Sequence, residues 1–242
     1  MGVSDGYVRL TTPGEIAAAE ELRDNWKAPE IPGRQLAVSE PELERFWRGE
    51  PSPPFDAFGA ALDATGLAWR CSDASRSLSI VDVGCSTGYY AQVLRHCGYR
   101  GAYMGVDYSE AMVEAARARR AGEMFEVGDA RALRFRDASF DIVVSGCFML
   151  HTSITEWPAS LAEAARIARK WVVLHRTPIA AGETEYWRKA AYDVPCIEIH
   201  VSRSDLLAMC AAAGLAREFV HRISGTADGA ANETWLMKKV GP

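Results

Sequence analysis

The sequence has no apolar run that approaches the roughly 18 residues of a membrane-spanning helix. Its N-terminus lacks the basic and apolar segments of a signal peptide. Its six cysteines include no C-x-x-C pair, which argues against a structural zinc site. The chain is also longer than the disulfide-stapled domains of secreted proteins. We therefore expect a cytoplasmic protein with reduced thiols, no metal and no membrane partner, and we leave its oligomeric state open.

An excess of positive charge is also missing. Lysine and arginine number 27 against 32 acidic residues, so the formal net charge is −5, and the isoelectric point is about 5.6. Nucleic-acid-binding domains usually present a basic face. We interpret the cluster of Arg117, Arg119 and Arg120 as a solvated helix face and expect no nucleic-acid partner.

The distribution of proline divides the chain into two parts. Residues 1–75 contain most of the prolines, and helices are predicted at about 14–26, 40–48 and 54–68. From residue 78 onward, apolar runs alternate with helical patterns; the predicted strands are 78–83, 102–106, 124–127, 140–145, 171–175 and two late segments, 217–223 and 233–239. We predict an N-terminal helical extension or lid (1–75) followed by an α/β domain (76–242).

Continuous apolar strands that alternate with helices predict a mostly parallel sheet covered on both faces. In such doubly wound sheets the ligand lies beyond the carboxyl ends of the strands. The positions of interest are therefore 84–88, 107–109, 128–130, 145–151 and 175–178.

The turn after the first of these strands has the sequence VDVGCSTG. Gly84 allows a sharp turn and close approach of a ligand, and Gly88 opens a helix whose N–H groups face that ligand. A dinucleotide fingerprint requires G-x-G-x-x-G, but its second and third glycine positions are Ser86 and Tyr89. The spacing therefore favours a small zwitterionic nucleoside such as S-adenosylmethionine over a dinucleotide.

Two further acids follow the next two strands. Asp107 ends the strand in GVDYSEAM, where a carboxylate can accept hydrogen bonds from both ribose hydroxyls. Asp129, in FEVGDA, is placed to accept a hydrogen bond from an exocyclic amine such as that of adenine. Because all of these positions meet at one edge of the sheet, they predict a single nucleoside site.

On these residues the sequence resembles the class I S-adenosylmethionine-dependent methyltransferases. VDVGCSTG resembles the family's first motif, GVDYSEAMVEAAR its second, and VGDARALRFRDASFDIVVSGCFMLH the run through its third and fourth strands. The resemblance implies a Rossmann-like, doubly wound, seven-stranded and mostly parallel sheet with an antiparallel last strand. It also implies S-adenosyl-L-methionine as cofactor. Ser86 departs from the family's frequent G-x-G-x-G pattern.

The resemblance also implies roles for individual residues. Asp82 would fix the turn and reach the cofactor's amino group, and Tyr108 would cover one face of adenine, beside Met112. The Ala130 N–H would bind a ring nitrogen next to Asp129. The backbone around the methionine portion would come from Gly84, Cys85, Ser86, Gly88, Ser145 and Gly146.

Candidates for the catalytic base are histidines near the strand ends, because an oxygen or nitrogen nucleophile must lose a proton. His151 follows the fourth strand and His175 closes the fifth, while His200 lies in a segment expected to cap the pocket. Each could instead be a packing residue. Arg176 is a candidate contact for a substrate carboxylate or phosphate, with a surface charge as the alternative.

The expected substrate is a small molecule with an oxygen or nitrogen nucleophile. The D/N-P-P-Y/F motif of amino-methylating nucleic-acid and glutamine enzymes is absent. An aromatic lid could form from Trp157, Tyr186, Trp187 and Tyr192. Metal-dependent catechol chemistry is disfavoured because no acid occupies 145–151, although Glu183, Glu185 and Asp193 keep it open. The alternatives are a protein-modifying methyltransferase, an NAD(P)-dependent oxidoreductase and a non-catalytic binding module.

Overall fold

The computed structural model describes residues 7–67, 78–146, 151–227 and 229–240. Of the six cysteines, Cys71 and Cys147 lie outside these ranges, and the other four are free thiols. Within the described ranges, every helix is too short or too polar to cross a bilayer.

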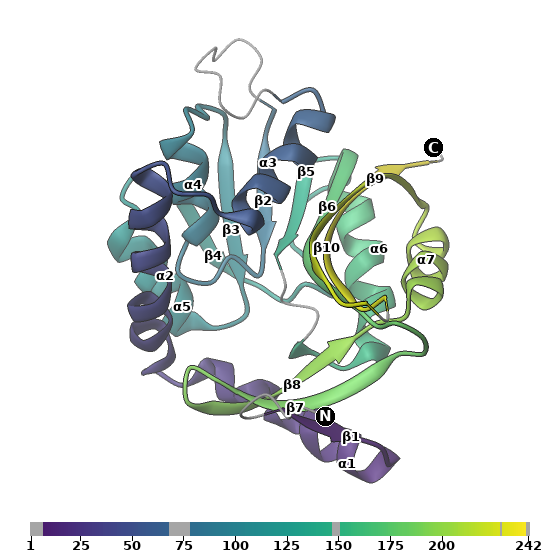
Figure 1. Cartoon of the computed structure of the whole chain (residues 1–242). Helices are drawn as coiled ribbons and strands as arrows, with labels where there is room; N and C mark the ends of the chain where they lie inside the picture. The colour runs from purple at the N-terminus through teal and green to yellow at the C-terminus, as the bar shows by residue number, and fades with distance from the viewer. Residues whose placement is uncertain (1–6, 68–77, 147–150, 228, 241–242) are drawn as a thin grey trace.

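The centre of the molecule is a seven-stranded sheet (Figure 1). Its members are β2 (Ile80–Val83), β3 (Tyr103–Asp107), β4 (Met124–Val127), β5 (Phe140–Gly146), β6 (Ala168–Ile179), β9 (Leu215–Gly225) and β10 (Ala231–Lys239), in the order β4-β3-β2-β5-β6-β10-β9. The pairs from β4 to β6 are parallel, and β10 runs antiparallel to both of its neighbours. The predicted sheet, including its antiparallel last strand, is confirmed.

Helices cover both faces of this sheet (Figure 1). Alternation along the strands explains why: in β5, Ile142 and Val144 belong to one buried cluster and Val143 to the other. The first cluster includes α3 (Pro53–Ala64), α4 (Tyr89–His96) and α5 (Glu110–Arg119). The second includes α6 (Trp157–Ile167) and α7 (Arg203–Ala212). Ser109 caps the N-terminus of α5, since its side chain accepts a hydrogen bond from the Met112 N–H.

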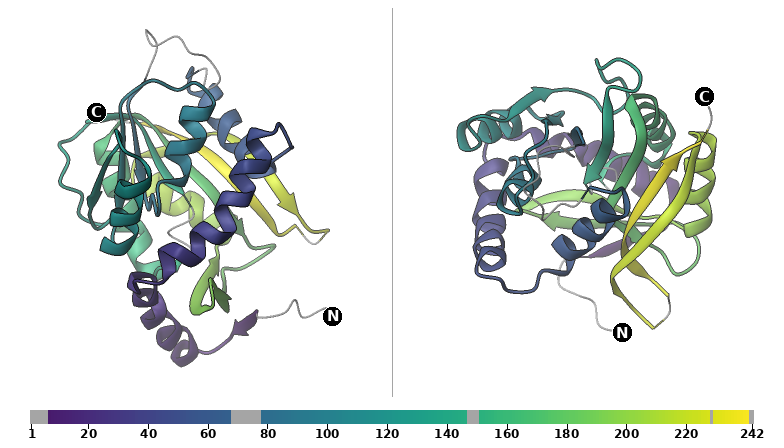
Figure 2. Two further views of the ribbon diagram at one scale, coloured as in Figure 1. Left: turned by 90° about the vertical axis from the view of Figure 1, so that its left-hand side faces the viewer. Right: turned by 90° about the horizontal axis from the view of Figure 1, so that it is seen from above.

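The N-terminal part is more helical than the sequence predicts. It contains α1 (Pro13–Glu20), the 3-10 helix η1 (Glu21–Lys27) and α2 (Ile31–Trp47). The predicted start of α2 at residue 40 is wrong, because the helix begins nine residues earlier and runs through Pro41. Proline costs a helix one hydrogen bond, and the packing of α2 on α4 and α5 outweighs that cost. Figure 2 shows these elements along one flank of the molecule.

A second, small sheet was not predicted. The hairpin of β7 (Glu185–Ala191) and β8 (Val194–His200) pairs with the short N-terminal strand β1 (Val8–Leu10), all antiparallel. Only Tyr192 and Asp193 lie in the hairpin loop, and both have positive φ, at 52° and 60°. This sheet lies below the main sheet in Figure 1, next to η1. One further 3-10 turn, η4 (Ile154–Glu156), precedes α6.

Candidate active site

The turn after β2 has the backbone conformation that its glycines predict. Gly84 and Gly88 have φ of 79° and 75°, and Ser86 between them has φ of 52°, which is uncommon for a residue with a side chain. The N–H groups of Gly84 and Cys85 both donate to the Val106 carbonyl, at 2.8 and 3.0 Å. A Cβ on Gly88 would lie 2.9 Å from Phe125 Cζ, so this position also requires close packing.

Asp107 ties this turn to the end of β3. One carboxylate oxygen accepts the Ser86 N–H at 2.8 Å, and the other accepts the Ser109 N–H at 2.9 Å. Burial raises the pKa of Asp107 to about 6, although these backbone N–H groups favour its charged form. Each carboxylate oxygen can accept more than one hydrogen bond, so Asp107 retains capacity to bind a ligand's hydroxyls.

Asp82 lies deeper than the other predicted residues. Its carboxylate accepts the Tyr103 O–H at 2.8 Å, and its second oxygen is buried with no hydrogen-bond partner among the described residues. Burial raises the pKa of Asp82 to about 7, and the charge of Asp107 adds to this effect. The side chain does not line the cavity described below, so any reach to a ligand from Asp82 is indirect.

The turn and the strand ends open on one cavity of about 440 Å³, a size typical of small-molecule sites. Nine predicted residues line it: Gly84, Cys85, Ser86, Asp107, Tyr108, Met112, Asp129, Ala130 and His151. Its described lining does not include Asp82, Gly88, Ser145, Gly146 or His175. Ser145 is buried with no hydrogen-bond partner for its hydroxyl in the described parts of the chain.

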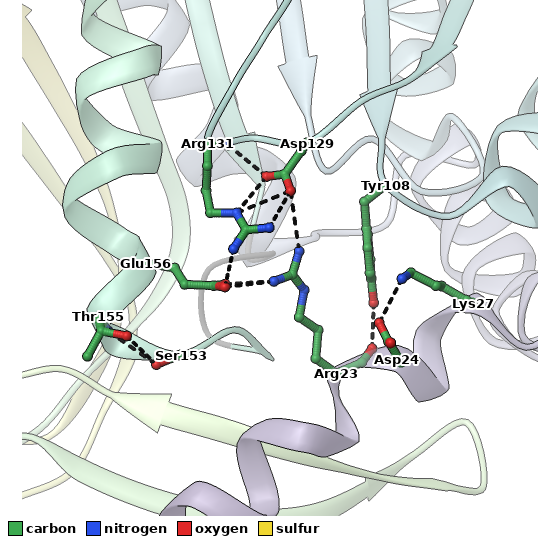
Figure 3. A network of polar contacts seen from close by, with 9 residues as sticks. All are labelled: Arg23, Asp24, Lys27, Tyr108, Asp129, Arg131, Ser153, Thr155 and Glu156. Carbon is green, nitrogen blue, oxygen red and sulfur yellow. Dashed lines mark hydrogen bonds and ion pairs between the residues drawn. The ribbon is translucent and has the colours of Figure 1, made fainter.

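A charged network closes the cavity next to β4 (Figure 3). Arg131 binds Asp129 through its backbone N–H and Nε, each at 2.9 Å from Oδ1, and its guanidinium also contacts Glu156. These hydrogen bonds lower the pKa of Asp129 to about 2. Arg23 of η1 donates to both Glu156 oxygens, at 2.9 and 2.8 Å, and lies 3.8 Å from Asp129.

Tyr108 joins the same network beside Asp129 (Figure 3). Its hydroxyl donates to the Arg23 carbonyl at 2.6 Å, and the Arg23 guanidinium carbon lies 5.1 Å from the centre of the Tyr108 ring. The predicted residues Tyr108 and Asp129 thus share Arg23 as a partner. Arg23 lies about a hundred positions before Asp129 in the chain. No local pattern in the sequence indicates this contact.

The two predicted catalytic histidines lie in different environments. His151 is half-buried at the cavity wall, and its Nδ1 lies 2.8 Å from the Ile197 carbonyl oxygen. Since a carbonyl only accepts, Nδ1 carries the proton and the lone pair is on Nε2. Burial and the charge of Lys189 lower the pKa of His151 to about 3. The ring is therefore neutral at physiological pH.

His175 is fully buried, and both ring nitrogens are hydrogen-bonded. Nδ1 lies 2.8 Å from the Thr234 hydroxyl, and Nε2 lies 2.6 Å from the hydroxyl of Tyr90, a cavity-lining residue. Burial lowers the pKa of His175 well below its usual value. In this position His175 can act on a ligand only through Tyr90.

The cavity wall also includes residues that the sequence reasoning missed. The N-terminal part contributes Tyr7, Arg23, Trp26, Gln35, Val38, Ser39 and Glu42, and the hairpin contributes Lys189, Ala191 and Glu198 beside the expected Tyr192. Gln35 of α2 accepts hydrogen bonds from the hydroxyls of Ser86 and Thr87 in the glycine turn. No motif in the neighbouring sequence marks these residues as part of a site, because only the fold brings them close to the strand ends.

The other candidates occupy varied positions. Trp157 is part of the core of α6, and Tyr186 and Trp187 lie on β7 outside the described cavity lining. Arg176 lines the cavity with a left-handed φ of 56°, and His200 binds Glu198 at 2.8 Å. In the described part of the chain, no three His, Cys, Asp or Glu side chains are grouped to hold a metal ion.

Comparisons with known proteins identify methyltransferases as similar in sequence. Residues 80–170 match a family profile described as "Methyltransferase domain". Among curated relatives, malonyl-[acyl-carrier protein] O-methyltransferase of Serratia marcescens is 32% identical over 106 residues, 44% of this chain and 40% of that protein. Demethylmenaquinone methyltransferase of Roseiflexus castenholzii is 36% identical over 91 residues, 37% of each chain. The chain thus spans less than half the length of these relatives.

Solved structures share the fold over more of the chain. The 1,6-didemethyltoxoflavin-N1-methyltransferase of Burkholderia thailandensis, with bound 1,6-didemethyltoxoflavin and S-adenosylhomocysteine, covers 100% of this chain and 99% of its own, with a TM-score of 0.64 and 17% identity. Magnesium protoporphyrin IX methyltransferase of Synechocystis covers 90% of this chain and 95% of its own, with a TM-score of 0.61 and 16% identity. Sheet order and strand-end turns define a doubly wound nucleoside-binding protein. The matched domain at residues 80–170 and the shared fold together support the resemblance to the class I S-adenosylmethionine-dependent methyltransferases.

Proposed function

We propose that this protein transfers a methyl group from S-adenosylmethionine to an oxygen or nitrogen atom of a small molecule. The observation that carries the proposal is the single cavity in which the glycine turn, Asp107 and Asp129 meet a neutral histidine, His151. Each of the first three comes from the carboxyl end of a different neighbouring strand. That arrangement matches a ligand with an amino acid portion, a sugar and a base.

The residues present fit this cofactor. The backbone of 84–88 would hold the methionine portion, Asp107 the ribose hydroxyls, and Asp129 with the Ala130 N–H the adenine edge, beside Tyr108. Polar atoms of three cavity-lining residues, Trp26 Nε1, Ser39 Oγ and Asn232 Oδ1, are buried without a hydrogen-bond partner in the described chain. Such atoms cost about 1–3 kcal/mol each, and a polar ligand at this wall would offset that cost.

When bound, S-adenosylmethionine supplies an electrophilic sulfonium methyl group, and its sulfur is released as the neutral thioether of S-adenosylhomocysteine. The protein then has two tasks, which are to align an acceptor atom with that methyl group and to take up the acceptor's proton. The Nε2 lone pair of His151 takes up the proton. Trp26, whose ring centre lies 4.7 Å from that of His151, holds the imidazole in place.

The small-molecule assignment rests on how the cavity is enclosed. Residues of the N-terminal helices and of the small sheet form the wall across from the strand ends, so an acceptor has to fit within the cavity. The relatives and structural neighbours are named for malonyl-[acyl-carrier protein], demethylmenaquinone, magnesium protoporphyrin IX and 1,6-didemethyltoxoflavin.

Calorimetry with two ligands tests the cofactor assignment. S-adenosylhomocysteine is expected to bind with a one-to-one stoichiometry and to raise the melting temperature, because it binds only the folded state. NAD⁺ is the comparison ligand, and we expect no binding, because Ser86 and Tyr89 replace the glycines that admit a pyrophosphate. Tighter binding of NAD⁺ would instead favour the oxidoreductase alternative.

We also propose that residues 7–67 act as a lid over the cofactor. Arg23 binds Glu156 and lies beside Asp129, its carbonyl accepts the Tyr108 hydroxyl, and Asn25 donates to the Pro195 carbonyl at 2.8 Å. The residues expected to hold adenine are thus bonded to the N-terminal part. These contacts must open whenever the cofactor is exchanged.

Arg23→Ala is therefore expected to speed dissociation of S-adenosylhomocysteine about fivefold to tenfold, measured by stopped-flow displacement. The Arg23 and Glu156 side chains are 21% and 22% exposed, and Nη1 alone contacts both carboxylate oxygens. We expect this pair to contribute about 1 kcal/mol or slightly more. Arg48→Ala, which breaks an exposed pair with Glu50, is the control and should leave the rate unchanged. Equal dissociation rates in all three proteins would contradict the lid.

A further inference from the structure

A buried polar cluster on the small sheet forms part of the cavity wall. Glu198 of β8 is 6% exposed. It forms an ion pair with Lys189 of β7, accepts the Tyr7 hydroxyl at 3.4 Å and lies 2.8 Å from His200 Nε2. Lys189 also donates to the Tyr7 hydroxyl at 3.2 Å. Lys189, Glu198 and Tyr7 all line the cavity.

The burial of Glu198 determines the charge of Lys189. A buried carboxylate is stable only when it is paired and hydrogen-bonded, and the partners of Glu198 satisfy that requirement. The pair in turn holds Lys189 as an ammonium ion, with its side chain 18% exposed. The small sheet thus places an ion pair at the wall of the cavity, with the Lys189 ammonium and the Glu198 carboxylate both among the lining residues.

The proposed base lies within the field of this ammonium ion. The charge of Lys189 disfavours the protonated form of His151, and a weak base removes protons efficiently only from an acidic group. Aromatic rings also form the wall next to His151. The ring centre of Trp26 lies 4.7 Å from that of His151, and the ring centre of Tyr192 lies 5.8 Å from that of Trp26, edge to face. Aromatic walls of this kind favour a flat, apolar ligand body.

We propose that the acceptor is a planar acid, such as a phenol, an enol or an acidic ring N–H, which is bound as its anion next to the Lys189 ammonium. Lys189 is then the residue that determines specificity for acidic acceptors, and Glu198 positions it. This inference rests on the proposed methyl transfer, because it names the acceptor class of the same cavity. Arg176 also lines the cavity, with a left-handed φ of 56°, and is a further cation of the described wall beside Lys189, Arg23 and Arg131.

A coloured phenol tests the inference without any methyl transfer. The probe is 4-nitrophenol, whose phenolate absorbs visible light, titrated against protein saturated with S-adenosylhomocysteine and against protein alone. We expect the bound probe to ionise about one pH unit lower than the free probe, which is a roughly tenfold preference for the anion. Nitrobenzene, a neutral molecule of similar shape, is expected to compete at least about tenfold more weakly.

The matched variant is Lys189→Met with Glu198→Gln, which removes both charges so that no carboxylate is left buried and unpaired. It should bind the probe with no lowering of the probe's pKa, whereas Lys170→Met, at an exposed lysine, should behave like the wild type. An unshifted or raised pKa in the wild type, absence of probe binding, or an equal shift in the double variant would each overturn the inference. Failure of S-adenosylhomocysteine to bind would count against the proposed methyl transfer. The titration of 4-nitrophenol against protein alone would still decide whether the cavity prefers a phenolate.

Discussion

Replacing Asp107 with alanine is expected to weaken S-adenosylhomocysteine binding about a hundredfold or more while the protein stays folded. Hydrogen bonds to a charged acceptor contribute about 1.5–3 kcal/mol each, and we propose that Asp107 accepts two of them from the ribose. The substitution also frees the Ser86 and Ser109 N–H groups that now bind the carboxylate. The glycine turn then loses its link to β3, which adds to the loss of affinity.

The control for this measurement is Glu114→Ala, which removes the same charge from an exposed position on α5. Calorimetry should show unchanged affinity for that variant, and circular dichroism should show a native fold for both. Asp107→Asn keeps the size of the side chain, and it should fall between the wild type and Asp107→Ala. Wild-type affinity in Asp107→Ala would contradict the proposed ribose contact.

The affinity should also depend on pH in a defined direction. The pKa of Asp107 is raised to about 6 by burial, and only the ionised carboxylate accepts both hydroxyl protons. Binding is therefore expected to weaken as the pH falls through about 6 and to be restored above it. Asp82 lies in the same buried region, and its pKa of about 7 means that it titrates over an overlapping pH range. The contribution of Asp107 is therefore the part of the pH dependence that is lost in Asp107→Asn.

Replacing His151 with alanine is expected to lower turnover about a hundredfold and to leave S-adenosylhomocysteine affinity within about twofold. General-base catalysis contributes roughly 10²–10⁴ in rate, and the low end applies because burial and Lys189 make His151 a weak base. Turnover is measured as transfer of a labelled methyl group to the first acceptor that supports it. Because the pKa of His151 is about 3, its ionisation should add no pH-dependent limb between pH 5 and 8.

His96→Ala is the matched control, since His96 is exposed at the end of α4 and contacts the rings of Phe46 and Trp47. Its turnover should equal that of the wild type. If His151→Ala also retains wild-type turnover, the proton is taken up elsewhere, and His151 acts only as a packing partner of Trp26. His175→Asn offers a further comparison, because its effect should be transmitted through Tyr90.

The sequence by itself determined the main sheet and the side of the cavity that the strand ends form. Continuous apolar strands can only be buried on both faces, and each turn residue follows its strand directly. Gly84, Asp107 and Asp129 could therefore be placed at one edge from spacing alone, and the structure brings them to one cavity. These features depend on residues that are close in the chain, which is why local patterns indicate them.

The tertiary structure alone decided the cavity wall across from the strand ends. The β7–β8 turn has Tyr192 and Asp193 where hairpins with two positive-φ residues usually have Asn-Gly, and Pro195 weakens the strand pattern, although β8 tolerates it as an edge strand. The cavity wall further depends on pairs such as Tyr7 with Glu198 and Arg23 with Glu156. Contacts across such separations arise only when distant segments pack together, and no period or spacing in the sequence records them.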